Sequence, residues 1–248
     1  MKALLFAASL ARASGPLPPA SGPSVEAATG AWVSGAILRG EVAPFSASER
    51  DIQALAVQGR WAPIPTVELR ADWAWARARF PAVDTGFGSG DLRLGTRAVP
   101  WEGRGPIPGV VLDWEVKLPN APEDSGLGTD ETDVQGMVLA CWTGDRWRLQ
   151  AGGGLAILGS PVQHAAQDDA ALVHARGALE LGPTWVQVGL DGRLQSPRNP
   201  HDLRADVGLS WTRGRLSLGA VGLVGLTPAA PDLGARLLVG LVPADGGA

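Results

Sequence analysis

Apolar and polar residues alternate with a period of two along most of the chain after residue 29. This period places successive side chains on opposite faces of an extended strand. Clusters of Gly, Pro, Asn and Asp separate the alternating segments from one another. The pattern predicts strands near residues 31–39, 52–61, 66–77, 91–99, 107–118, 133–142, 146–158, 170–181, 184–194, 202–212, 215–225 and 233–242.

The two faces of these segments differ sharply in polarity. In the segment 66–77, Leu69 and Trp73 lie on one face, whereas Glu68 and Arg70 lie on the other. Each apolar face extends over roughly ten residues, the length that a tilted strand needs to cross a bilayer. Alternation alone does not decide whether the apolar face points outward or inward.

The connections between the segments alternate between short and long. The short ones are 62–65, 143–145, 182–183 and 213–214. The long ones are 40–51, 78–90, 119–132, 159–169, 195–201 and 226–232, and the link 100–106 is intermediate. Outer-membrane barrels have short turns on one side and long loops on the other. We therefore predict an all-β fold, an up-and-down antiparallel transmembrane β-barrel of about twelve strands over residues 30–248; a soluble exported barrel that binds a ligand is the alternative.

The N-terminus has the pattern of an export signal. A charged start, a short apolar stretch and small residues before Ser14 predict a signal peptide over residues 1–13. Residues 14–29 are rich in Pro, Ser, Gly and Ala and are expected to form a flexible leader. A disordered apolar N-terminus is the alternative. With the barrel pattern, this favours the outer membrane of a Gram-negative bacterium.

The composition excludes several classes and adds one oddity. Acidic residues outnumber basic ones 25 to 21, which argues against a nucleic-acid binder. The chain has ten Trp and no Tyr. Outer-membrane barrels carry aromatic girdles at the lipid headgroups, so most of these rings are predicted to lie at the membrane interface: Trp32, Trp61, Trp73, Trp75, Trp101, Trp142, Trp147 and Trp211. Trp114 is expected deeper in the apolar band, and Trp185 is expected to point inward.

If the apolar face meets lipid, the charged face lines the lumen. The predicted lumen-lining residues are Glu68, Arg70, Asp72, Asp91, Arg93, Arg97, Asp113, Glu115, Lys117, Arg148, His174, Arg176, Asp191, Arg193, Arg204, Asp206 and Arg236. Charges removed from bulk water must be paired or hydrated. They can therefore form salt-bridged ladders that stabilise the wall, or they can select permeants. Both signs are mixed, so strong ion selectivity is not expected.

Catalysis and metal binding find little support in the sequence. The three histidines are not placed beside a Ser and an orienting carboxylate, as a hydrolase would need. The acidic stretch 123–133 matches no calcium-loop spacing. We expect no enzyme activity, no metal and no cofactor. The thiol of Cys141 is expected to be a passive, inward-facing group.

Several short motifs resemble one family of outer-membrane proteins. They are the glycine-rich stretch 86–97 (GFGSGDLRLGTR), Lys117-Leu118-Pro119-Asn120, and Gly126-Leu127-Gly128-Thr129 followed by Asp133-Val134. They resemble the outer-membrane transporter-like family of MetA-pathway phenol-degradation proteins, over about residues 60–160. Arg97 stands where the family has Lys, and Asn120 where it has Thr. The resemblance implies a barrel that passes small, including hydrophobic, compounds, and it implies no catalytic residue.

Two functions remain open from the sequence. One is a passive channel or transporter for small solutes. The other is a plugged barrel that anchors a larger envelope assembly, such as a secretion or surface-motility machine. The expected partners are outer-membrane lipid, a small permeant in the first case and envelope proteins in the second, with the barrel itself monomeric.

Overall fold

The computed structural model describes residues 30–41, 49–80, 83–84, 86–121, 131–159, 168–195, 201–228, 230 and 232–241. The expected signal peptide and leader lie outside these residues, so both stay predictions. No helix in the described part of the chain is long and apolar enough to span a membrane.

The described residues form strands joined by turns and loops. The strands are β1 (Gly30–Glu41), β2 (Glu49–Ile64), β3 (Val67–Phe80), β4 (Val83–Asp84), β5 (Gly88–Trp101), β6 (Gly109–Leu118), β7 (Asp133–Thr143), β8 (Trp147–Leu158), β9 (Asp168–Leu181), β10 (Thr184–Gln195), β11 (Asp202–Arg213), β12 (Leu216–Gly225) and β13 (Leu233–Leu241). Apart from the two-residue β4, which pairs only with the end of β3, they correspond to the twelve segments predicted from the alternation.

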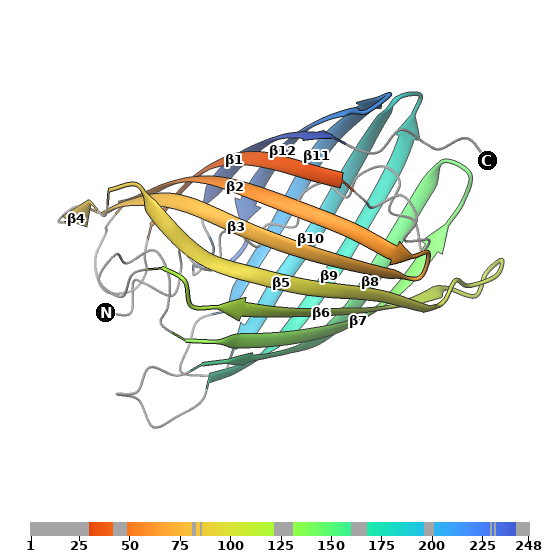
Figure 1. Cartoon of the computed structure of the whole chain (residues 1–248), viewed down its shortest axis with the longest axis horizontal. Coiled ribbons are helices and arrows are strands. Elements are labelled where there is room, and N and C mark those ends of the chain that lie inside the picture. Colours follow the sequence, from red (N-terminus) through yellow and green to blue (C-terminus); the bar gives the residue numbers. More distant parts are fainter. Residues whose placement is uncertain are drawn as a thin grey trace.

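The twelve long strands close into a barrel. Each pairs antiparallel with its neighbour along the chain, β5 following β3, and β1 pairs with both β2 and β13. Figure 1 shows the strands following one another around the wall, with β1 beside the last strands of the chain. The predicted fold class, an up-and-down antiparallel barrel, is confirmed. Closure pairs both edges of the sheet, so every long strand has two partners.

One predicted connection lies two residues later in the chain than expected, at 102–108 between β5 and β6. The intermediate link was placed at 100–106, but β5 continues to Trp101 and includes Pro100. The β5–β6 pairing shifts register between Ala98 and Trp101. Proline has no amide hydrogen to give to the ladder and is tolerated at such irregularities, which explains how the strand passes through it.

Short and long connections lie at opposite ends of the barrel. Two short turns pass through Gly182 and Gly214, whose φ angles of 64° and 59° are in the left-handed region that glycine adopts easily. The first residue of β1 and the last of β13 lie at this same short-turn end, because Ala31 pairs with Leu241. This arrangement matches the asymmetry of outer-membrane barrels.

The outer face is apolar and the inner face carries the charges. Large apolar side chains such as Leu155 and Leu237 are each 67% exposed, whereas Glu68 and Lys117 are each only 1% exposed. A soluble barrel would show the reverse arrangement. The structure therefore decides the orientation that alternation left open.

Five of the predicted interface tryptophans gather near the short-turn end. Trp61, Trp101 and Trp147 are exposed there, and Trp142 and Trp211 are half-buried. The rings of Trp73 and Trp75 lie further along β3, with their centroids 4.3 Å apart. The side chain of Trp32 lies outside the described part. Of the other two rings, Trp114 is 56% exposed and Trp185 is buried. Contact of these rings with lipid headgroups stays a prediction.

Candidate functional site: the charged lumen

The space enclosed by the strands, here called the lumen, contains a cavity of about 210 Å³. Strands β2, β3 and β5–β13 all contribute side chains to its lining. Twelve of the predicted lumen residues line it: Arg70, Asp72, Arg97, Asp113, Glu115, His174, Arg176, Asp191, Arg193, Arg204, Asp206 and Arg236. Cations and anions both line this cavity, so its wall has no single sign.

The other five predicted residues lie on the same inner face, outside the cavity lining. Glu68, Asp91, Arg93 and Lys117 are buried. Arg148 lies over the ring of Trp185, 4.4 Å from its centroid. The structure thus places all of the predicted residues on the inner face, whereas their role toward a solute stays a prediction.

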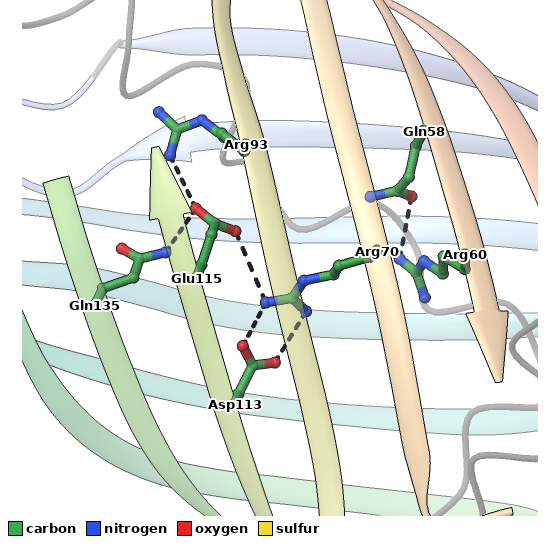
Figure 2. Close-up of polar contacts among 7 residues, drawn as sticks. All are labelled: Gln58, Arg60, Arg70, Arg93, Asp113, Glu115 and Gln135. Atoms are coloured by element: carbon green, nitrogen blue, oxygen red, sulfur yellow. Dashed lines mark hydrogen bonds and ion pairs between the residues drawn. The ribbon is translucent and has the colours of Figure 1, made fainter. Parts of the chain in front are cut away.

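One ion-pair network joins four neighbouring strands. Arg70 of β3 donates two hydrogen bonds to Asp113 of β6, one of them 2.9 Å long, and lies 3.7 Å from Glu115. Glu115 also accepts hydrogen bonds from Arg93 of β5 at 2.9 Å and from Gln135 of β7 at 2.7 Å. Figure 2 shows Arg70 and Arg93 meeting at Glu115. A guanidinium that holds a carboxylate through two bonds is fixed in direction as well as in place.

Gly95 of β5, the strand between β3 and β6, allows the Arg70 side chain to reach β6. In the sheet, Arg70 pairs with Gly95, and Gly95 pairs with Glu115. A Cβ atom at position 95 would overlap Arg70 Nε and would lie 2.8 Å from its Cγ. The Arg70 side chain therefore lies across the place where a side chain of β5 would stand. Glycine at this position leaves room for an arginine to cross one strand and pair on the next.

A second glycine, Gly189 of β10, allows an arginine of β9 to reach a carboxylate of β11 in the same way. Gly189 pairs with both Arg176 and Asp206. Arg176 crosses it and donates to Asp206 at 2.9 Å and to Asp191 at 3.3 Å. His174 Nδ1 lies 2.6 Å from the other oxygen of Asp191. A Cβ atom at position 189 would lie 2.9 Å from Arg176 Nη2 and would overlap Asp206.

A third cluster closes the long-loop end of β5, β6 and β7. The ammonium of Lys117 lies 3.0 Å from Asp133 and 3.6 Å from Asp91. Asp91 also accepts from the backbone of Asn120, and Asp133 accepts from the backbone of Gly159. This cluster therefore links the strand wall to the first residues of two loops.

The lumen also holds polar residues that the sequence analysis left out. Gln58, Arg60, Gln135, Gln150 and Asp202 line the cavity. Strict alternation could have found them, because Gln58 and Arg60 alternate with Val57 and Trp61, whose side chains are exposed.

The inner face also carries clusters of apolar side chains, which the sequence analysis did not predict. One cluster is Val99, Val111, Leu139 and Cys141, so the thiol is buried among apolar neighbours. A second is Ala156, Leu158, Ala170 and Leu172. Val221, Leu223 and Leu238 of β12 and β13 line the cavity as well. The inner wall is therefore amphipathic, since charged networks and apolar clusters share several of its strands.

The described residues bring together no group of three or more His, Cys, Asp or Glu side chains that could hold a metal ion. The acidic residues of the stretch 123–130 lie outside the described part.

The sequence matches no family model and no curated protein. Solved structures with the same fold do match. An outer-membrane channel from Pseudomonas putida F1 is 11% identical, covers 94% of this chain and 98% of its own, and has a TM-score of 0.65. The transport unit of the autotransporter AIDA-I from Escherichia coli is 8% identical, with coverages of 98% and 96% and a TM-score of 0.55. The translocator domain of the autotransporter NalP from Neisseria meningitidis is 12% identical, with coverages of 86% and 88% and a TM-score of 0.54. The chain therefore has the fold of outer-membrane β-barrels.

Proposed function

We propose that this protein is an outer-membrane channel of a Gram-negative bacterium that lets small solutes cross passively through the lumen. The observation that carries the proposal is the combination of an apolar outer face with a charged, cavity-containing interior in a closed barrel. An apolar band suits lipid, and a polar interior is typical of barrels that conduct solutes.

The lumen sets the kind of solute. A cavity of about 210 Å³ is smaller than the ~300–1,000 Å³ pockets that hold drug-sized ligands, so the permeants are small. The apolar clusters suit solutes with a hydrophobic part. The resemblance to the phenol-degradation family also supports small solutes with a hydrophobic part. A role in uptake for that pathway is included in this proposal.

Swelling of liposomes that contain the purified protein tests the proposal. Vesicles with the barrel should swell in isotonic solutions of small neutral solutes such as glycerol, and more slowly as the solute grows. Ala74→Trp places a large ring on the buried inner face of β3, beside the cavity, and should slow swelling severalfold. Ala71→Trp, on the exposed face of the same strand, is the matched control and should leave the rate unchanged.

A plugged barrel that anchors an envelope assembly is the second candidate. The observation in its favour is the cross-linking of the inner wall by the Arg70, Arg176 and Lys117 networks. A folded barrel that gives no swelling with any solute would reject the channel, and co-purification of envelope proteins from native membranes would then support the anchor.

A further inference from the structure

Arg193 of β10 differs from three other arginines of the cavity wall. Arg70, Arg176 and Arg204 each form an ion pair with a carboxylate in the lumen. Arg193 also lines the cavity, but none of the described residues forms a hydrogen bond or ion pair with it, and its Nε is buried without a partner. A buried donor left without a partner is unfavourable, so water or a ligand is expected at this position.

The carboxylates near Arg193 are already engaged. Asp133 and Asp202 act on it electrostatically. However, Asp133 is held by Lys117 at 3.0 Å, and Asp202 accepts a hydrogen bond of 2.8 Å from Arg204. The guanidinium of Arg193 is therefore a cation at the cavity whose neighbouring anions are neutralised by other residues.

An apolar surface lies directly beside this cation. Arg193 pairs in register with Leu172 of β9, and Leu172 lines the same cavity. Leu172 packs with Ala156, Leu158 and Ala170 to form the apolar cluster on β8 and β9. A solute at this place would meet a positive charge at one end and a hydrocarbon surface along its body.

We propose that Arg193 and Leu172 form a binding site for small organic monoanions, in which the guanidinium holds a carboxylate and the apolar cluster holds a short hydrocarbon tail. This inference rests on the proposed channel and names its substrate class. A carboxylate at this place accepts charge-assisted hydrogen bonds from the guanidinium. The small cavity limits the tail to a few carbon atoms.

The test measures binding of hexanoate to the folded, detergent-purified full chain by calorimetry. Arg193→Gln should weaken binding about tenfold or more, since a hydrogen bond to a charged group contributes about 1.5–3 kcal/mol. Arg193→Lys should restore part of the affinity. Arg148→Gln removes an interior arginine outside the cavity lining and should change binding less than twofold.

Two further ligands test the carboxylate and the hydrocarbon tail of hexanoate separately. Acetate keeps the carboxylate but lacks the tail, and 1-hexanol keeps the tail but lacks the charge; both should bind at least fivefold more weakly than hexanoate. Leu172→Ala should weaken hexanoate but not acetate. Equal binding by the wild type and Arg193→Gln, or no hexanoate binding at all, would overturn the inference.

Permeation separates this inference from the proposed function. If liposomes swell with neutral solutes but hexanoate binding does not depend on Arg193, the channel stands and the site is rejected. If hexanoate binds through Arg193 but no solute permeates, the site stands and the channel is rejected.

Discussion

At the residue scale, two glycines determine which charges can meet. Gly95 and Gly189 lie directly between an arginine and the carboxylate that it reaches. The sequence identified the charges of both networks, but it could not show that each arginine pairs across a strand. That pairing depends on the register of three strands, which the sequence pattern does not specify.

Gly95→Ala should destabilise the barrel through Arg70. The added methyl group displaces the guanidinium, so Asp113 loses its two hydrogen bonds from Arg70 and Glu115 loses an ion pair, at a cost of about 1–3 kcal/mol. The free energy of unfolding in urea, followed by tryptophan fluorescence in detergent, measures this. Gly59→Ala is the control, because a Cβ atom there meets nothing within 4 Å.

A double-mutant cycle tests the mechanism. In an Arg70→Ala background, Gly95→Ala should have little further effect, since the side chain that it displaces is already gone. Equal costs in both backgrounds would show that the glycine acts through the backbone alone.

At the element scale, Lys117 holds strands and loops together. It contacts Asp91 of β5 and Asp133 of β7 from its place on β6, and both carboxylates also accept hydrogen bonds from loop backbone. The family resemblance covers Lys117 as part of a motif, but the sequence pattern identifies no partner for it. Lys117 meets these partners because it pairs in register with Arg93 of β5 and with Asp133 of β7.

Lys117→Met should therefore lower stability far more than a surface substitution. Removing the buried ammonium takes the Lys117 ion pair away from both Asp91 and Asp133, and breaking a buried ion pair costs about 3–5 kcal/mol. The urea midpoint in detergent reports the change. Arg104→Met, at an exposed cation beside the Trp101 ring, should cost at most about 1 kcal/mol; a similar loss in both variants would contradict the assigned role.

At the scale of the whole molecule, the barrel is apolar outside and charged inside. This inverts the arrangement of a water-soluble protein and makes the outer band the surface for lipid. The position of a residue along a strand should then decide how much a charge on the outer face costs.

Val207→Arg tests that arrangement. Val207 is exposed on the outer face near the middle of β11, and an arginine at mid-bilayer costs about 2–4 kcal/mol. Leu216→Arg, at the start of β12 near the short-turn end, should cost about 0–1 kcal/mol. Unfolding of the barrel in phospholipid vesicles gives both values, and equal costs would argue against a membrane band centred on these strands.

The sequence by itself determined the strands, their order and the two faces, because a period of two and the alternation of turn and loop lengths are local properties. It also assigned the charges to a common face, since alternation places them together. Only the tertiary structure decided which face is outside and which charges pair. Arg193 and Arg204 look alike in the sequence, yet Arg204 bonds to Asp202 and Arg193 lies beside Leu172 with no described partner. The physical reason is that pairing depends on barrel closure and on register between strands, which bring together residues that are distant in the chain.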